Sequence, residues 1–428
     1  FLDVSDSRFG CGGAQALLSA HARAPLLALE RLDLFACHIG PKGGEAIGSL
    51  LAVTGGGHSP LAAPPPPLQS PCFADNAMQD RGLVALASAL RTNAALAASL
   101  TDLDLSSNGL GLDDDSSLRM PCGGENACDE FARALTHHAT GVHTGGGVGL
   151  RRLNLSQNFL GDAGLTGLIP ALRAAAGLTW LDVSCCNLRD RGLRALAKLL
   201  REPSGLACLE VLGTYHQRTV SDDAARELML SLRDGGAPRL MALHAGRLNM
   251  RGHASLSAGE AAVELVERRP SLRYVDLRDN FPLEASLRAR LEACRHGRGG
   301  GGEGEAEGAP PLRLFLPGDP WEDGAPGWSG AAADADAAAE GGTADGGGGD
   351  GDGGDGTGDG GEGYCHNDIF SAMEGWHQAG LASSRTMWCR FSQTVYFYRG
   401  EDVGGELNQP AFVIQEPGGE LSHAAGEA

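Results

Sequence analysis

The stretch LRRLNLSQNFLGDAGLTGLIPALRAAAG, residues 150–177, decides the fold, because LTWLDVSCCNLRDRGLRALAKLLREPSG, residues 178–205, repeats its pattern directly after it. Each of these 28-residue units opens with apolar residues at alternate positions, such as Leu153 and Leu155, which predicts a short strand with one buried face. Each closes with leucines at the spacing of an amphipathic helix. One strand and one helix cannot bury these apolar faces alone, so we expect many such units to stack side by side.

One polar position lies between the predicted strand and the predicted helix of each unit. Asn158 holds it in the first copy and Cys186 in the second, and a glycine follows six residues later in both. An amide, or the weaker S–H donor of cysteine, can satisfy backbone groups in such a turn. We use this position as the index of a repeat and expect the asparagine and cysteine residues that hold it to be structural. The index residues are Ser7, Cys37, Asn76, Asn108, Asn158, Cys186, Thr214, Gly246 and Asn280.

Three segments interrupt the period and have the composition of loops. Residues 52–71 contain a four-proline run, and residues 111–124 and 139–149 are rich in glycine and small polar residues. We expect all three to be insertions. Several helices are predicted from leucine and alanine spacing, with Ser257 and Asp222 as N-caps.

The consensus LxxLxLxx(N/C)xLxxxGxxxLxxxL resembles the ribonuclease-inhibitor class of leucine-rich repeats, and its copies cover roughly residues 1–294. This resemblance implies an α/β fold, a horseshoe-shaped solenoid of about nine strand–helix repeats with a parallel sheet on the concave face and helices outside. It also implies that partners bind on the concave face or on the loops at its edge.

The sequence changes character after Cys294. Residues 295–363 form a low-complexity Gly/Asp/Glu linker with 3 basic and 15 acidic side chains, which should be disordered because it has too little apolar surface to offset chain entropy. Alternating leucines within it predict a capping strand at 311–316. Residues 364–428 regain aromatic side chains and are predicted to form a small β-rich tail.

Part of this tail, near residues 388–410, is similar to a WW module. Trp388, the run Tyr396 to Tyr398 and Pro410 match the family pattern. Leu407 stands where the ligand-stacking tryptophan belongs, and the first hairpin loop is short, so peptide binding is not carried over. A degenerate WW-like module, a plain β-hairpin and an unclassified tail are the alternatives.

The residue between the two inward-facing residues of each strand should project from the concave face. Six of these nine central residues are acidic, so strands about 4.8 Å apart would hold like charges side by side. The central residues are Asp3, Asp33, Cys72, Asp104, Asn154, Asp182, Glu210, Ala242 and Asp276. The residues that flank them include Arg31, Phe35, Arg152, Trp180, His244, Tyr274 and Arg278.

Two interpretations of this face are open. The acidic row is an ordinary feature of the repeat consensus, and exposed charge rows usually contribute little. Alternatively, the face binds a basic or mixed-charge protein partner, with Trp180 and Tyr274 as aromatic anchors. The candidate partner-binding residues are Asp33, Phe35, Asp104, Arg152, Asn154, Trp180, Asp182, Glu210, His244, Tyr274, Asp276 and Arg278.

No residue pattern indicates catalysis or a bound cofactor. Walker, GxSxG and HExxH motifs are absent from the sequence. Cysteine and histidine residues gather twice, but the first group lacks zinc-finger spacing and we predict no metal site at either. The two groups are Cys122, Cys128, His137, His138 and His143, and Cys365, His366, His377 and Cys389.

Composition favours a protein of a reducing compartment. Eleven cysteines without framework-like spacing indicate free thiols, and neither a signal peptide nor a membrane-spanning apolar run is present in the sequence. The net charge of −20 lies mainly after residue 294, and no basic patch indicates nucleic acid. We predict a cytoplasmic protein that binds neither nucleic acid nor membrane, with nuclear or cytoskeletal association left open. The chain starts without Met inside a predicted strand, so we expect a fragment.

The function that fits these features is a non-enzymatic protein-interaction scaffold, because a solenoid offers a large surface and its fold alone supplies no chemistry. Ran GTPase-activating proteins combine the same repeat class with an acidic tail, which would make the chain a regulator of a small GTPase, although that family's catalytic arginine is assigned to no position here. Sensor repeats of NLR-type receptors would require an upstream nucleotide-binding domain.

Overall fold

The computed structural model describes residues 2–23, 30–53, 68–111, 127–137, 149–203, 205–217, 219–253, 255–297, 312–319, 394–397 and 411–414. The chain divides into two compact units, Phe1–Asp319 and Pro320–Ala428.

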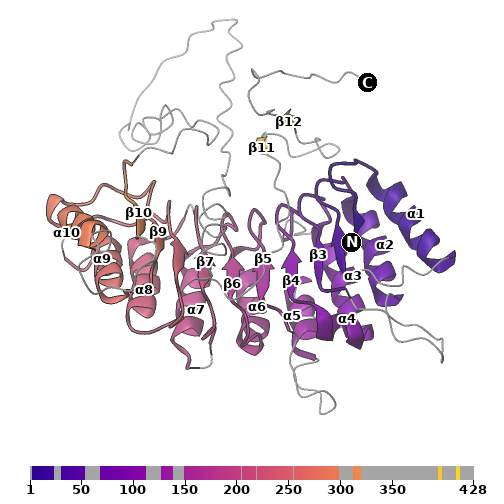
Figure 1. Ribbon diagram of the computed structural model, residues 1–428, viewed down its shortest axis with the longest axis horizontal. Coiled ribbons are helices and arrows are strands. Elements are labelled where there is room, and N and C mark those ends of the chain that lie inside the picture. Colours follow the sequence, from indigo (N-terminus) through magenta and orange to yellow (C-terminus); the bar gives the residue numbers. More distant parts are fainter. Residues whose placement is uncertain are drawn as a thin grey trace, which may run out of the picture. The chain divides into compact units, whose positions relative to one another are not determined.

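Ten short parallel strands form one sheet in the first unit, and their order in the sheet is their order in the sequence (Figure 1). They are β1 (Leu2–Asp3), β2 (Arg31–Asp33), β3 (Ser70–Cys72), β4 (Asp102–Asp104), β5 (Arg152–Asn154), β6 (Trp180–Asp182), β7 (Val211–Gly213), β8 (Ala242–His244), β9 (Tyr274–Asp276) and β10 (Arg313–Phe315). A helix follows each strand from β1 to β9, and the short α4 is added after α3. The predicted fold class, a solenoid of parallel strands and helices, is confirmed.

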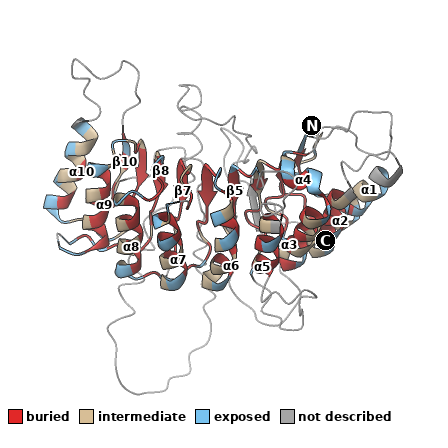
Figure 2. Ribbon diagram, turned by 90° about the horizontal axis from the view of Figure 1, so that it is seen from below, coloured by how far each residue is buried: buried red, intermediate tan, exposed pale blue. Residues whose placement is uncertain are grey.

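The helices lie side by side on one face of this sheet, and we call the opposite face concave (Figure 1). They are α1 (Gly10–Arg23), α2 (Gly40–Val53), α3 (Gln79–Thr92), α4 (Ala94–Ser99), α5 (Ala127–His137), α6 (Gly161–Ala174), α7 (Asp190–Arg201), α8 (Asp222–Arg233), α9 (Ala258–Arg268) and α10 (Ala285–Gly297). Buried residues concentrate in the strands and on one side of the helices (Figure 2).

The core is built from the periodicities of the sequence. In β5, Leu153 is buried, and Leu155 directly after the strand is buried with it. Leucines at helical spacing on α6, among them Leu165 and Leu168, belong to the same continuous core. Because each repeat closes the apolar side of the next, the core runs along the whole stack.

The tenth strand ends the sheet on the C-terminal side. β10 pairs in parallel with β9 and places Leu314 opposite Val275, and Leu314 is buried. Arg295 of α10 donates to the carbonyl oxygen of Leu314, and Arg288 pairs with Asp319 at 3.0 Å. β10 lies within the segment 311–316 and belongs to the same unit as the repeats.

The structure corrects the index in the seventh and eighth repeats. Asp182 lies opposite Gly213, and Gly213 lies opposite His244, which moves the index from Thr214 to Gln217 and from Gly246 to Leu248. The Nε2 of Gln217 donates to the carbonyl oxygen of Val183 at 2.8 Å, and its Oε1 accepts from the amide of Leu188 at 2.7 Å. In the seventh repeat, Val211 and Leu212 are adjacent and both apolar, which allows either phase of alternation. In the eighth the phase of alternation is unchanged, but Leu243 corresponds to Leu181 and not to Val183.

Other expectations can be compared with the described residues. Ser257 is the N-cap of α9, whereas the cap of α8 is Ser221 and not Asp222. Asp222 instead accepts from the amides of Arg251 and Ala258. Residues 52–53 end α2 and residues 70–71 begin β3; most of the three predicted insertions lies outside the described residues.

The second unit contributes two described strands, β11 (Thr394–Phe397) and β12 (Ala411–Ile414), which pair antiparallel. Trp388, Leu407 and Pro410, on which the WW-like pattern depends, lie outside the described residues, as does most of the linker 295–363. None of the helices that the structure describes is long and apolar enough to cross a membrane.

Candidate partner-binding surface

A ladder of side chains at the index position holds the strands in register. Asn76 donates to the carbonyl oxygen of Leu34 in the preceding repeat at 2.6 Å, and its Oδ1 accepts from the amides of Cys37 and Ile39 at 3.0 and 3.3 Å. Asn108 and Asn280 make the equivalent bonds. Cysteine supplies only the donor, since the Sγ of Cys37 lies 3.0 Å from the carbonyl of Val4 and that of Cys186 lies 3.1 Å from Leu155. The ladder therefore fixes the positions of the side chains on the concave face.

The acidic row on the concave face is part of the turn that follows each strand. The Oδ1 of Asp104 accepts from the amide and the hydroxyl of Ser106 at 2.9 and 2.7 Å. Asn154 accepts the same two bonds from Ser156. Asp3, Asp33, Asp182 and Asp276 each accept the amide two residues further on. These side chains thus stabilise the turn after each strand, whether or not a partner binds.

Burial makes the row electrostatically uneven. It raises the pKa of Asp33, to which the nearby Asp3 carboxylate adds, and it raises the pKa of Asp104 despite the hydrogen bonds from Ser106. Burial would also raise the pKa of Asp276, but the His244 imidazole and the Arg278 guanidinium outweigh it and hold that pKa well below its usual range. The ionised form is therefore less favourable at Asp33 and Asp104 than at Asp276.

Arg278 and His244 enclose Asp276 from two sides. The guanidinium donates from Nε to Oδ1 at 3.0 Å and from Nη2 to Oδ2 at 2.6 Å, in bidentate geometry. The Nε2 of His244 lies 3.2 Å from Oδ2. All three side chains are at most 1% exposed, so this group is a buried ionic centre at the C-terminal half of the face.

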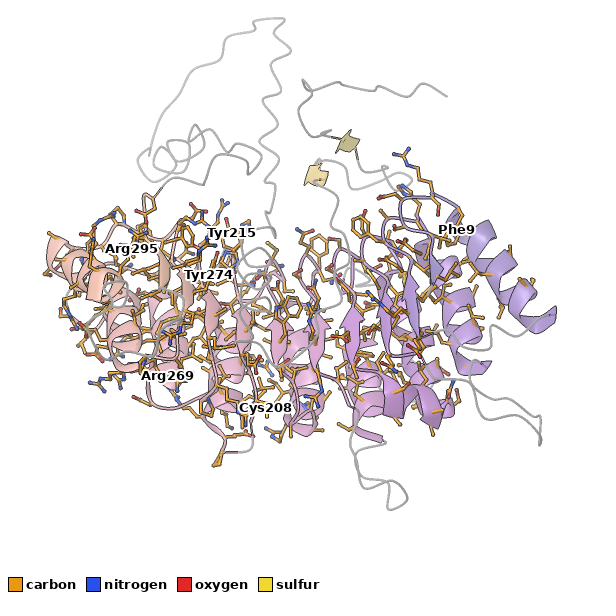
Figure 3. All side chains as sticks on the ribbon, in the orientation of Figure 1. Phe9, Cys208, Tyr215, Arg269, Tyr274 and Arg295 are labelled. Carbon is orange, nitrogen blue, oxygen red and sulfur yellow. The ribbon has the colours of Figure 1, made fainter. Side chains whose placement is uncertain are left out.

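Aromatic and arginine side chains extend along the face on both sides of this centre, from β5 to β10. The Tyr215 ring stacks on His244 with centroids 4.6 Å apart, and Tyr274 lies 5.5 Å from Phe315; Figure 3 labels both tyrosines on this part of the sheet. Two arginines lie over rings, Arg152 over Trp180 and Arg278 over Phe315, at 5.1 and 4.5 Å. We call this set the aromatic strip: Arg152, Trp180, Tyr215, His244, Tyr274, Arg278 and Phe315.

The structure brings most of the predicted contact residues to one face but not to one place. Arg152, Asn154, Trp180, Asp182, His244, Tyr274, Asp276 and Arg278 lie on or beside β5–β9. Asp33, Phe35 and Asp104 belong to β2 and β4, or directly follow them, nearer the N-terminus. Glu210 does not belong to the row, because Gly213 lies opposite Asp182 and Glu210 precedes β7. The same shift of register makes His244 the central residue of β8 in place of Ala242.

Two members of the aromatic strip, Tyr215 and Phe315, are absent from the contact residues predicted from the sequence. Tyr215 follows directly from the corrected index of the seventh repeat, in which it occupies the position of Phe35 and Arg278. Phe315 lies in the predicted capping strand and continues the central row beyond Asp276. Correct alignment of VLGTYHQ with the other repeats would have identified Tyr215 from the sequence.

Among the described residues, no three or more histidine, cysteine or acidic side chains are placed to hold a metal ion. Cys128 is buried at the start of α5. Cys122, His138, His143 and the four residues from Cys365 to Cys389 lie outside the described residues.

Comparison with known proteins identifies the repeats. The family model described as Leucine Rich repeat matches residues 29–48, 97–114 and 178–197, so the chain contains leucine-rich repeats. None of the curated proteins matches the sequence. Among solved structures, a chain of the yeast Rad7 and Elc1 complex is similar at 16% identity, over 64% of this chain and 77% of that chain, with a TM-score of 0.24.

Proposed function

We propose that this protein is a non-enzymatic interaction scaffold whose protein partner binds to the aromatic strip on the concave face. Leucine-rich repeats generally mediate binding between proteins, and we assign these to the ribonuclease-inhibitor class because full helices such as α6, with 14 residues, alternate with the strands.

The observation that carries the proposal is the uneven distribution of large side chains over the concave face. The aromatic strip places one tryptophan, two tyrosines and two arginines on β5–β10, and these are the residue types that dominate the binding energy of protein interfaces. Arg31 and Phe35 hold the matching positions at β2, whereas Cys72 and Ala74 hold them at β3 and Ser106 follows β4. The internal bonding of the fold is supplied by the index ladder and the acidic turns, which need none of these rings.

Charge supports a partner of mixed composition. Burial raises the pKa of Asp6 and of Asp33, and the nearby Asp3 carboxylate adds to both, so a basic segment would gain by lying near them. At β9 the carboxylate of Asp276 is already paired with Arg278, and recognition there would depend on the rings. We therefore expect the basic part of the partner to lie toward β1–β4.

Burial determines how binding must be tested. Trp180 is 3% and Tyr274 1% exposed, so a partner can reach these rings only if the side chains packed against them, such as Arg152 and Phe315, move. The experiment uses the full chain and also residues 1–319, which form a compact unit with its own core. Both are used as bait, and captured proteins are quantified by mass spectrometry.

The decisive variants are Trp180→Ala and Tyr274→Ala, and Phe159→Ala and Phe281→Ala are the controls for removal of an exposed ring outside the strip, since these rings are 39% and 55% exposed. A partner should be lost with the first pair and retained with the second, and its purified form should bind at least about 30-fold more weakly to the strip variants. Equal recovery from all four would reject the strip. Acceleration of GTP hydrolysis by a small GTPase would instead favour the regulator function.

A further inference from the structure

A second row of side chains lines the loop edge of the solenoid, one residue before the index. Residues at this position have a left-handed backbone in nine described repeats, with φ between 51° and 58°. Because the same conformation recurs at the same position, side chains from neighbouring repeats come together there. Ser107 and Gln157, for example, are hydrogen-bonded across adjacent repeats. We call this set the loop-edge row: Asp6, Ala36, Asp75, Ser107, Gln157, Cys185, His216, Arg247 and Asp279.

The loop-edge row pairs a thiol with an imidazole. The Sγ of Cys185 lies 3.7 Å from the Nδ1 of His216, and the two residues come from consecutive repeats. Both side chains are half-buried, at the edge of the molecule and outside its core. A thiol beside an imidazole can pass its proton to the ring, and the imidazolium then stabilises the thiolate, which is the nucleophilic form of cysteine.

We propose that Cys185 is a thiol-modification site, activated by His216, that forms mixed disulfides with small disulfide molecules. The imidazole accepts the thiol proton, and the thiolate attacks one sulfur of the small disulfide. A bond forms between that sulfur and Cys185 while the S–S bond of the reagent breaks. The departing thiolate takes the proton back from the imidazolium, so the exchange needs no other oxidant.

The adjacent cysteine has the opposite environment. Cys186 belongs to the index ladder and is fully buried, and burial raises the pKa of its thiol well above the usual value. Burial raises the pKa of Cys37 and of Cys128 in the same way. The repeat geometry thus separates two consecutive thiols, directing Cys186 into the core and Cys185 to the edge.

The charged groups around the pair are compatible with a thiolate. Tyr215 lies edge-on to the His216 ring at 5.8 Å, and its hydroxyl donates to the Oδ2 of Asp279 at 2.8 Å. Part of the negative charge of Asp279 is therefore engaged by that hydroxyl. Arg247, the next member of the loop-edge row, brings a positive charge to the same edge.

Site-resolved labelling of the full chain tests the proposal. The protein is treated with oxidised glutathione or with limiting iodoacetamide, and each cysteine is quantified by mass spectrometry after trypsin digestion. Cys185 and Cys186 share the peptide 174–189, so fragment ions are needed to separate them. The comparison thiol is Cys208, which is also half-buried.

At pH 7, Cys185 should react at least about tenfold faster than Cys208, and His216→Gln should reduce its rate to that of Cys208. His38→Gln is the matched control, because His38 is a half-buried histidine of the same edge in another repeat, and it should change nothing. The wild-type pH profile gives a second criterion: Cys185 should react below the usual thiol pKa of about 8.5, and Cys208 only near it. Equal rates, coincident profiles or an unchanged rate in His216→Gln would each overturn the assignment.

Discussion

Asn158 donates its side-chain amide to the carbonyl oxygen of Leu105, 53 residues earlier in the sequence, over 2.9 Å. Its Oδ1 accepts from the backbone amides of Asn108 and Leu110, both at 3.0 Å. One side chain therefore satisfies three backbone groups of the preceding repeat at a site that is 1% exposed. The insertion between these two repeats lengthens the connection without altering the bonds.

Replacement of Asn158 by Ala should lower the free energy of unfolding by at least about 2 kcal/mol, because each stranded buried group costs about 1–3 kcal/mol. Urea denaturation followed by circular dichroism measures the change. Gln15→Ala is the control, since Gln15 is an exposed side-chain amide of α1, and it should stay within about 0.5 kcal/mol of wild type. Equal midpoints for the two variants would contradict the role of the ladder.

The ladder also shows how far the sequence could predict the structure. Asparagine and cysteine mark the index in six repeats, which was enough for the fold, because period and leucine spacing are local features. Gln217 and Leu248 could not be recognised in this way. Gln217 makes the hydrogen bond of an index asparagine with a longer side chain. Leu248 has no polar side chain, and its backbone amide donates to the Oδ1 of Asn280. The aromatic strip depended on that register, so Tyr215 was found only in the structure.

The acidic row can be tested at Asp33, whose Oδ1 accepts from the amide of Phe35 at 3.1 Å. Asp33→Asn retains the acceptor and removes a charge whose pKa is raised by burial and by Asp3. A raised folded-state pKa means that the ionised form costs stability once the pH exceeds the unfolded value of about 3.9. As the pH rises from 4 to 7, the free energy of unfolding of Asp33→Asn, measured by urea denaturation, should therefore increase relative to that of wild type. Asp33→Ala lacks the acceptor, and its free energy of unfolding should be about 1 kcal/mol lower than that of wild type.

Asp276 should show the opposite dependence on pH. Against burial, His244 and Arg278 hold the pKa of this carboxyl below its usual range, so the ionised form contributes stability above the unfolded pKa of about 3.9. That contribution disappears as the pH falls through the lower folded-state pKa. Asp276→Asn should therefore be less stable than wild type at pH 7, and the gap should shrink below pH 4. A gap that stays constant with pH would show that charge contributes nothing at this position.

Close packing of neighbouring helices gives the last prediction. A Cβ at Gly48 of α2 would lie 2.6 Å from the Cβ of Ala85 and 2.7 Å from its carbonyl carbon on α3. Backbone cannot move away as a flexible side-chain end would, so Gly48→Ala must push the two helices apart and should cost about 1–3 kcal/mol. Gly12 of α1 has nothing within 4 Å of the same atom, and Gly12→Ala should be neutral or slightly stabilising because alanine favours helix. The midpoints of thermal unfolding of the two variants separate the effect of helix–helix packing from that of helix propensity. A Gly48→Ala protein as stable as Gly12→Ala would refute the close approach of α2 and α3.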